Sequence, residues 1–440
     1  MYTMKRFLSI ACMLACTSAA FSQATISPAK PQSRPVIISG ATIHVGNGQV
    51  INNGYIAFDK GKITAIGEGA VANATGAELI NASGKHVYPG FIVPVTDLGL
   101  VEYESVKATL DEAETGSVNP HIRALIAYNT DSKIIPTVRS NGILLAQVTP
   151  IGGLISGQSS VMMLDGWNWE DAVYKADVAI HLNWPIIATR GFGGGGGAPA
   201  PLSPAAATEA QERNQKAIDD LYKYFSEAKA YAELPKPTVI NTRYAAMKGL
   251  FDGSKKLFIN VNASKDILKA VVFTQKFGLK TVLVGANEAY LVADVLKKNN
   301  IPVIIEETQA LPANTDDDVY LPYKMPKILQ DAGVLYSLTG IGSWRQRNLP
   351  FEAGNAVGYG LTKEQALSMI TLNTAKILGI DKTVGSLEAG KDATLFISKG
   401  DALDMITLDV ENAFIQGKNI NLDNLHKQLY KRYSDKYGVK

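Results

Sequence analysis

Short β-strand patterns lie at both ends of this 440-residue chain, and a different pattern lies between them. In residues 36–88, apolar and polar residues alternate and are interrupted by turns such as "GNG" and "KGK". Residues 381–420 repeat the pattern in "GSLEAGKDATLFIS" and "NAFIQGKNI". Because two distant segments of one kind flank a segment of another kind, we predict one β-sandwich that both ends of the chain build together.

The middle of the chain, residues 89–380, alternates short apolar strands with amphipathic helices. The predicted strands are Phe91–Val95, Ile143–Val148, Leu257–Val261, Thr281–Val284, Val303–Ile305 and Val334–Leu338. The last predicted helix, "LTKEQALSMITLNTAKILG", has a capping box of Thr362 and Gln365 and ends at Gly379. Repeated βα units with apolar strands indicate a parallel sheet, open or closed into a barrel.

The first residues have the three-part pattern of a secretory signal peptide. Lys5 and Arg6 precede the apolar run "FLSIACMLACTSAAF", and small residues follow it. We expect residues 1–22 to be removed and the protein to be exported, to the periplasm or the extracellular space. The alternatives are an uncut anchor or a lipoprotein cut before Cys16. The only two cysteines lie inside this segment, so the mature chain would lack thiolate ligands and disulfides.

Three further segments stand apart from the main pattern. Residues 23–35 are rich in Pro and Ser and predict a flexible lead-in. Residues 191–208 are rich in Gly and Pro, and we interpret them as a surface insertion rather than a phosphate loop, because Pro-rich sequence follows the glycines. Residues 421–440 predict a helix whose apolar stripe docks on the protein or on a second subunit.

The charge balance gives no reason to expect nucleic acid or an anionic membrane as a partner. The chain has 43 Lys and Arg against 41 Asp and Glu. No stretch after the N-terminal segment is long and apolar enough to predict a membrane span.

Three stretches together carry a resemblance to a known family. They are "ISGATIHVGNGQVINNGYIAFDKGKITAIGEG", "VYPGFIVPVTDLGL" and "NLPFEAGNAVGYGLTKEQALSMITLNTAKILGIDKTVGSLEAGKDATLFI". They resemble the opening sandwich, the first barrel strand and the closing segment of the amidohydrolase superfamily of metallo-dependent hydrolases, in its imidazolonepropionase-like branch. The resemblance implies a (β/α)8 TIM-like barrel plus a composite β-sandwich formed by both ends of the chain. It also implies hydrolysis of non-peptide carbon–nitrogen bonds in small cyclic or linear amides.

The resemblance further implies a divalent metal, usually zinc, at the C-terminal mouth of the barrel. Such a metal lowers the pKa of a bound water and polarises the scissile carbonyl. The family's ligands are two histidines after strand one, histidines after strands five and six, and an aspartate after strand eight. At the matching positions this sequence has Val95 and Asp97, Asn260 and Asn262, Gly285, and Thr339 and Gly340.

The histidines cannot rebuild a zinc centre of the usual kind. A catalytic zinc needs about three protein ligands and an open position. The chain has five histidines, His44, His86, His121, His181 and His426. Only His121 and His181 lie where they can approach the mouth. His181 is the better candidate, although a single histidine is more often a structural residue. We therefore expect no metal ligands and no cofactor from the residues themselves.

Other polar residues near predicted strand ends are candidates for a site. Asp97 and His181 are the catalytic candidates, and the substrate-binding candidates are Asn260, Asn262, Glu306, Arg345 and Arg347. Oxygen ligands of this kind, together with Glu307, suit Ca²⁺ or Mg²⁺, but a solvated loop explains the two glutamates equally simply. The arginines can clamp a substrate carboxylate or close a loop through a salt bridge.

Two hypotheses about function remain. The first is an amidohydrolase with a degenerate, unusual metal site. The second is a catalytically inactive relative that binds a small-molecule ligand at the barrel mouth, or serves as a subunit of a homo-oligomer or of an assembly with a family-related partner.

Overall fold

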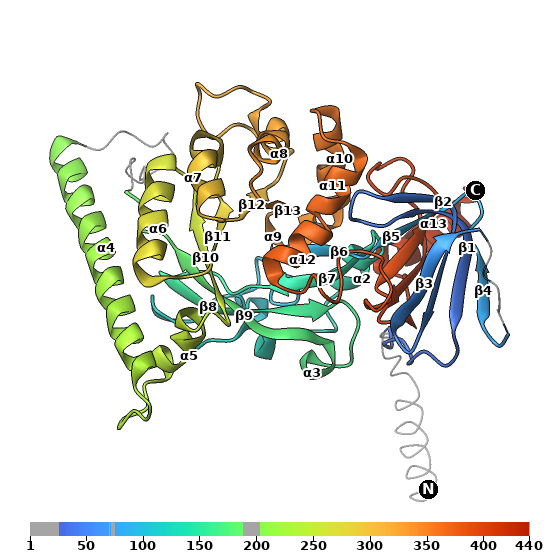
Figure 1. Ribbon diagram of the computed structural model, residues 1–440, viewed down its shortest axis with the longest axis horizontal. Helices are drawn as coiled ribbons and strands as arrows, with labels where there is room; N and C mark the ends of the chain where they lie inside the picture. The colour runs from blue at the N-terminus through green and yellow to red at the C-terminus, as the bar shows by residue number, and fades with distance from the viewer. Residues whose placement is uncertain (1–25, 70, 72–74, 188–202, 440) are drawn as a thin grey trace, which may run out of the picture.

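The computed structural model describes residues 26–69, 71, 75–187 and 203–439 (Figure 1). The predicted signal peptide and most of the predicted Gly/Pro-rich insertion lie outside these residues. The described strands form two sheets of eight strands each.

Both ends of the chain build the first sheet. Its strands are β1 (Val36–His44), β2 (Val50–Asp59), β3 (Lys62–Glu68), β4 (Glu78–Asn81), β5 (His86–Pro89), β14 (Leu395–Ser398), β15 (Val410–Ile415) and β16 (Lys418–Asn419). β5 and β14 pair antiparallel and so join the two ends. Phe58 of β2 and Phe414 of β15 meet edge to face at 5.0 Å in the core of this sheet. The predicted composite sheet domain is confirmed.

The second sheet forms a nearly closed barrel. Its strands follow one another around the sheet in chain order, and they are β6 (Phe91–Thr96), β7 (Ile143–Val148), β8 (Ile155–Met163), β9 (Val173–Asn183), β10 (Lys256–Val261), β11 (Thr281–Gly285), β12 (Val303–Glu306) and β13 (Tyr336–Thr339). The Thr339 hydroxyl donates to the Val95 carbonyl oxygen at 2.6 Å and connects the last strand to the first. This architecture confirms the predicted TIM-like barrel.

One strand departs from a regular (β/α)8 pattern. β8 pairs antiparallel with both β7 and β9, so the barrel contains hairpin connections there instead of βα units. The sequence analysis missed β8 and β9. β8 has the sequence "ISGQSSVMM", and all of it is buried even though it contains Gln and Ser. The polar residues find partners inside the protein, since the Gln158 amide donates to the Pro120 carbonyl oxygen at 3.0 Å. Because β8 contains polar residues, its sequence did not predict a buried strand.

Most helices cover the outside of the barrel (Figure 1). The α-helices of the barrel region are α2 (Ile134–Arg139), α3 (Trp169–Ala172), α4 (Pro204–Glu233), α5 (Thr242–Phe251), α6 (Ser264–Phe277), α7 (Ala293–Lys298), α8 (Leu321–Ala332), α9 (Gly342–Arg345), α10 (Leu349–Gly358), α11 (Lys363–Met369) and α12 (Leu372–Leu378). Short 3-10 helices are η1 (Lys107–Thr109), η2 (Ala124–Ala127), η3 (Ala289–Val292) and η4 (Gln346–Asn348).

The last predicted barrel helix is two helices, α11 and α12. The capping box of Thr362 and Gln365 begins α11 as predicted, and Gly379, at φ 68°, ends α12. The chain breaks at Ile370 and Thr371 because the Ile370 carbonyl oxygen accepts a hydrogen bond from the backbone of Ile92, at 2.9 Å. A continuous helix would use that carbonyl internally. The break therefore attaches this helical segment to the first barrel strand.

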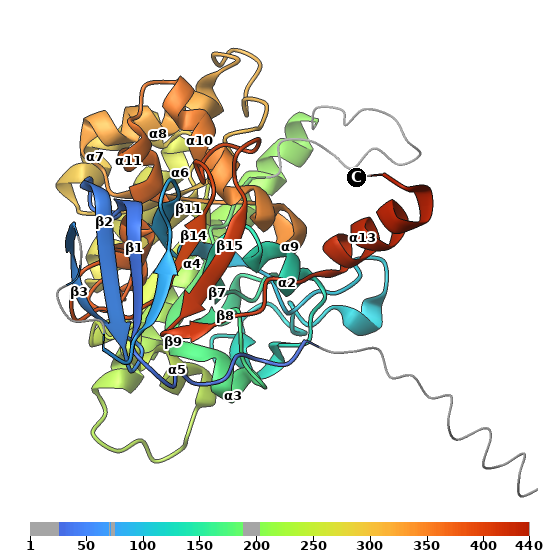
Figure 2. The ribbon, with the colours of Figure 1, turned by 90° about the vertical axis from the view of Figure 1, so that its right-hand side faces the viewer.

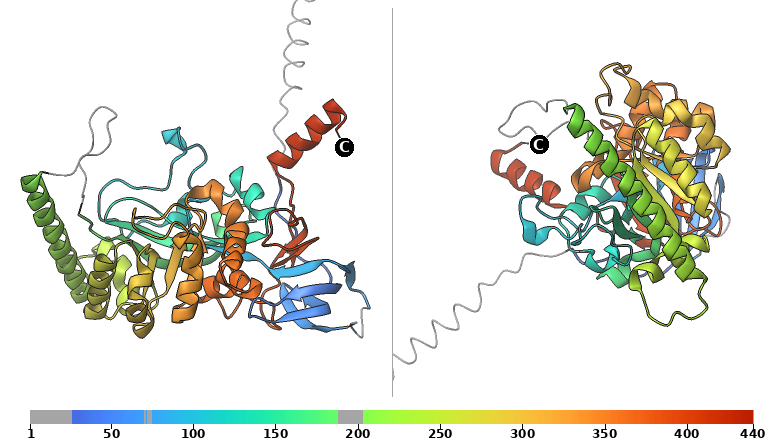
Figure 3. Two further views of the ribbon diagram at one scale, coloured as in Figure 1. Left: turned by 90° about the horizontal axis from the view of Figure 1, so that it is seen from above. Right: turned by 90° about the vertical axis from the view of Figure 1, so that its left-hand side faces the viewer.

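The C-terminal helix α13 (Leu425–Tyr437) projects from the rest of the molecule (Figures 2 and 3). None of its residues is buried, so the expectation that its apolar stripe docks on its own chain is wrong. Docking on a second subunit remains a prediction. Asn424 fixes the start of the helix through a hydrogen bond to the Ser140 hydroxyl, at 3.1 Å. Among the residues with described structure, no helix has the length and hydrophobicity needed to cross a bilayer.

The described part of the predicted flexible lead-in, residues 26–35, runs along the body. The backbone of Ala29 donates to the Asp165 carboxylate at 2.9 Å. The Gln32 side chain donates to the Phe58 carbonyl oxygen and accepts from the backbone of Gly61. This segment is therefore held against both sheets.

Two glycines of α10 test how this helix packs against the segment between β14 and β15. A Cβ at Gly354 would collide with the carbonyl oxygen of Leu403, whereas a Cβ at Gly358 meets nothing within 4 Å. We expect Gly354→Ala to lower the free energy of unfolding by about 1–3 kcal/mol, the usual cost of overpacking. Gly358→Ala, the matched control, should leave it unchanged or raise it by up to about 1 kcal/mol. Chemical denaturation measures both, and equal effects of the two substitutions would contradict the packing.

Candidate ligand site at the barrel mouth

The mouth of the barrel lies where the parallel strands end. Asn260 of β10 pairs in register with Asn183 of β9, and Glu306 of β12 pairs with Thr339 of β13. These residues stand at the C-terminal ends of neighbouring strands. They therefore gather at one end of the barrel. Asn183 was missed from the sequence because its strand was missed; its position directly after the apolar "AIHL" was the available signal.

The asparagines at the mouth are bonded to each other. The Asn260 amide donates to the Asn183 side-chain oxygen at 2.6 Å. The Asn183 amide in turn donates to the Gly153 carbonyl oxygen at 2.7 Å. These bonds fix the orientation of both amides, and they leave the Asn260 side-chain oxygen without an assigned donor.

Gly285, at the end of β11, stands at the position where the family resemblance places a histidine. Gly285 has φ 80°, in the left-handed region that favours glycine. A Cβ there would collide with the side-chain oxygen of Asn262. Asn262 therefore fills the space that a side chain at position 285 would need.

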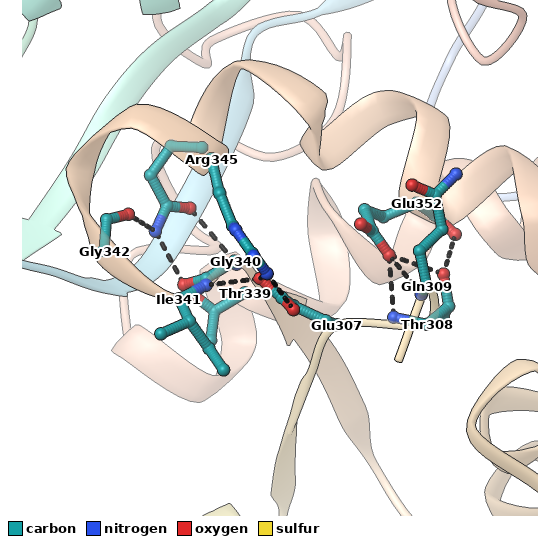
Figure 4. Close-up of polar contacts among 10 residues, drawn as sticks. Glu307, Thr308, Gln309, Thr339, Gly340, Ile341, Gly342, Arg345 and Glu352 are labelled. Atoms are coloured by element: carbon teal, nitrogen blue, oxygen red, sulfur yellow. Dashed lines mark hydrogen bonds and ion pairs between the residues drawn. The ribbon is translucent and has the colours of Figure 1, made fainter. Parts of the chain in front are cut away.

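The buried Glu307 links the loop after β12 to the loop after β13 through hydrogen bonds and an ion pair (Figure 4). One nitrogen of Arg345, Nη1, contacts both carboxylate oxygens of Glu307, at 2.7 and 2.6 Å. The backbone of Ile341 donates to the same carboxylate at 3.2 Å. The Glu307 side chain is 6% exposed and that of Arg345 is 64% exposed. Of the two roles considered for Arg345, the structure has the loop-closing salt bridge.

A second carboxylate anchors the beginning of the same loop (Figure 4). One oxygen of Glu352, in α10, accepts from the backbones of Thr308 and Gln309 at 2.7 and 2.8 Å, and from the Thr308 hydroxyl at 2.7 Å. Charged acceptors make hydrogen bonds stronger than neutral ones. Arg347 lies elsewhere, with its guanidinium 5.7 Å from the ring centre of Trp344. Arg345 is thus engaged by Glu307, whereas the Arg347 guanidinium stacks on Trp344.

Two carboxyl groups at the mouth have raised pKa values. Burial raises the pKa of Asp97, and the nearby Glu112 and Glu104 raise it further. One Asp97 oxygen, Oδ1, is buried and has no hydrogen-bond partner among the described residues. Burial also raises the pKa of Glu306, as does the charge of Glu307. Both groups are therefore more easily protonated near neutral pH than a solvent-exposed carboxylate.

A small cavity of about 130 Å³ lies beside Glu306, between the ends of β11 and β12 and the start of α8. Its wall combines polar and apolar side chains, including Asn287, Glu306, Leu311, Met325 and Ile341. It can hold a small molecule or one side group of a larger one.

His181 lies in the barrel core, below the mouth. Its Nε2 is 2.8 Å from the Ser159 hydroxyl oxygen, which also accepts from the Gln147 amide at 2.6 Å. The ring is 1% exposed, and burial lowers its pKa to about 3. His181 is thus a neutral histidine in the barrel core. It forms one polar cluster with Gln147 and Ser159, and each of the three comes from a different strand. Sequence reasoning missed Gln147 and Ser159, because polar residues inside strands give no distinctive pattern.

The residues at the mouth do not fit the zinc centre that the family resemblance implies. Within the described chain, no three His, Cys, Asp or Glu side chains come together so that they could hold a metal ion. His44 is bound to Glu364 at 2.7 Å and lies in the first sheet. No histidine stands at the matching positions, a side chain at position 285 would have to displace Asn262, and Glu307 is already bound by Arg345.

Comparisons with known proteins agree with the fold. The sequence profile of the Amidohydrolase family matches residues 325–421. The protein "Amidohydrolase tasK" of Hapsidospora irregularis is 32% identical over 115 residues, which are 24% of this chain and only 12% of that protein. The crystal structure of an amidohydrolase from Thermotoga maritima MSB8 has a TM-score of 0.73 at 22% identity, over 87% of this chain and 99% of that chain. Molinate hydrolase has a TM-score of 0.56 at 14% identity, over 89% and 96%.

The barrel and its composite sheet share their fold with the solved amidohydrolase structure from Thermotoga maritima MSB8. The family profile and the curated relative each match only part of this chain, and they support the resemblance to the amidohydrolase superfamily that the three sequence stretches predicted.

The buried His181 should make stability depend on pH. Its pKa is about 3 in the folded state against an ordinary 6.5, so below pH 6.5 the unfolded chain binds a proton there that the folded chain does not. Its contribution to the free energy of unfolding should fall by about 1.4 kcal/mol for each pH unit between these values. The difference between wild type and His181→Gln should therefore shrink as the pH falls from 6.5 to 4.5.

Urea denaturation at several pH values measures this difference. His426→Gln, at an exposed position of α13, is the control and should keep the wild-type dependence on pH. A His181→Gln variant with the wild-type slope would show that His181 is not held neutral.

Proposed function

We propose that this protein is an exported member of the amidohydrolase superfamily that binds a small amide-type molecule at the barrel mouth without a catalytic metal. The observation that carries the proposal is that the groups at the family's ligand positions are engaged within the protein. Asn260 is bonded to Asn183, Asn262 packs against Gly285, and Thr339 donates to the Val95 carbonyl oxygen. Export is supported by the signal-peptide pattern of residues 1–22.

The chemistry of the mouth suits an amide. Asparagine side chains offer both a donor and an acceptor, which are complementary to the carbonyl and N–H of a small amide. Glu306, when protonated, adds a donor for a carbonyl oxygen, and when ionised it accepts from an N–H. The adjacent cavity of about 130 Å³ is small, and sites for drug-sized ligands measure roughly 300–1,000 Å³. The proposed ligand is therefore a small cyclic or linear amide.

A second candidate is hydrolysis of a non-peptide carbon–nitrogen bond by carboxyl groups alone. The raised pKa values of Asp97 and Glu306 favour it, since burial moves the pKa of each carboxyl group in the direction that general acid–base catalysis requires. In this reaction an ionised carboxylate would take a proton from the attacking water, and a protonated carboxyl would give one to the leaving nitrogen.

Binding and turnover can be separated in one experiment. Purified mature protein is first analysed by elemental mass spectrometry after growth with added zinc, manganese and calcium. It is then titrated with a panel of cyclic amides and N-acyl amino acids by calorimetry, with and without EDTA, and NMR follows any hydrolysis. We expect no stoichiometric metal in the purified protein. We also expect the ligand to bind equally well with and without EDTA, and no hydrolysis product to form.

Asn260→Ala should weaken binding about tenfold, because it removes a hydrogen-bonding group from a partly buried site. Asn419→Ala, at an exposed position of β16, is the matched control and should bind as wild type does. Hydrolysis that resists EDTA and disappears in Asp97→Ala would favour the second candidate. Stoichiometric metal whose removal abolishes hydrolysis would contradict both.

A further inference from the structure

A second, larger cleft lies at the opposite end of the barrel from the mouth. Its volume is about 840 Å³, and its walls come from both sheets. The β2–β3 turn contributes Lys60 and Lys62, the start of β9 contributes Lys175, the segment after α12 contributes Lys382, and the β15–β16 turn leads into Lys418. Since Lys175 starts the strand whose other end holds Asn183, this cleft is distinct from the amide site.

The cleft is strongly positive, because five lysines face one carboxylate. That carboxylate, Asp392, already has partners within the protein. It pairs with Lys62 at 2.5 Å and accepts from the Tyr174 hydroxyl at 2.7 Å. Lys175 donates to the Gly379 carbonyl oxygen at 3.0 Å. No negative group among the cleft-lining residues is left to balance the remaining lysines.

Three of the ammonium groups have no fixed partner. In the described chain, no hydrogen bond or ion pair is formed by the ammonium of Lys60, Lys382 or Lys418. Lys60 and Lys382 are exposed, and Lys418 is half-buried in the wall. The three come from separate segments that only the tertiary structure brings together, so they are not the charged face of one helix.

A partly buried lysine close to Lys175 adds to the positive potential, although it does not line the cleft itself. Lys256, at the start of β10, donates to the Ile377 carbonyl oxygen at 2.5 Å. Burial lowers its pKa to about 8, and the charge of Lys175 lowers it further. Like charges held this closely repel each other, and the repulsion is relieved when an anion enters.

We propose that this cleft binds a small anion with two or more phosphate or sulfate groups. Three uncompensated ammonium charges match an anion of at least two negative charges. Each ammonium can donate charge-assisted hydrogen bonds to phosphoryl or sulfuryl oxygens. The site is independent of the proposed amide site, because the two lie at opposite ends of the barrel and share no residue.

Calorimetric titration with inorganic pyrophosphate, at constant ionic strength, tests the proposal. The variant Lys60→Gln/Lys382→Gln/Lys418→Gln removes the free charges. The control variant Lys427→Gln/Lys431→Gln/Lys436→Gln removes the same formal charge from α13, whose residues are not buried. We expect the cleft variant to bind pyrophosphate at least about tenfold more weakly than wild type, and the control to bind within about twofold.

Orthophosphate and a sulfated disaccharide are titrated in the same way. They show whether the cleft requires two anionic groups and whether it accepts sulfate as well as phosphate. The proposal expects orthophosphate to bind at least about tenfold more weakly than pyrophosphate, since it offers one group instead of two. Pyrophosphate should also raise the melting temperature of the wild type and the control, but not that of the cleft variant. Absent pyrophosphate binding, equal weakening in both variants, or equal affinity for orthophosphate would overturn the proposal.

Discussion

The structure depends on the pairing of β5 with β14, which joins residues more than three hundred positions apart in the chain. Leu395 lies opposite Pro89 in this pair. Directly beside it, Phe396 meets Phe91 edge to face at 4.9 Å and stacks on Tyr88 at 5.4 Å. Tyr88 belongs to the first sheet and Phe91 to the barrel, so one aromatic cluster holds both ends of the chain and both sheets together. Gly142 has no side chain because a Cβ there would strike Phe396.

This joint has consequences at both ends of the barrel. At the mouth it sets the direction of β6, whose Val95 carbonyl accepts the closing bond from Thr339. At the opposite end it brings the turns of the first sheet against the start of β9, which creates the lysine cleft. The same packing therefore positions a polar, weakly charged mouth and a strongly positive cleft at the two ends of one scaffold.

Hydrogen bonds and one ion pair fix the polar groups at the mouth. Asn183 and Asn260 hold each other, Glu307 is bound by Arg345, and Glu352 fixes the loop after β12. A rigid polar rim of this kind favours recognition, because its groups are already oriented before a ligand arrives. The barrel fold thus carries a mouth whose polar side chains are held by one another and by the backbone.

Much of the fold could be predicted from the sequence. Apolar runs of three to six residues identified β6, β7 and β10 to β13, and alternation identified the strands of the first sheet. β8 and β9 could not be found in this way, because Gln158, Ser159 and His181 are polar and yet buried. The candidate site was predicted only in part: Asn260 and Glu306 lie at the mouth, but His181 lies in the core and Arg345 closes a loop.

The sequence by itself determined most of the elements and the residue types at the strand ends, because hydrophobic periodicity and residue identity are local properties. Only the tertiary structure decided which polar groups face each other. The Asn183–Asn260 bond, the Glu307–Arg345 pair and the gathering of Lys60, Lys382 and Lys418 all join segments that are distant in the chain. Their charges and hydrogen bonds depend on distance and burial, and neither quantity exists until the chain has folded.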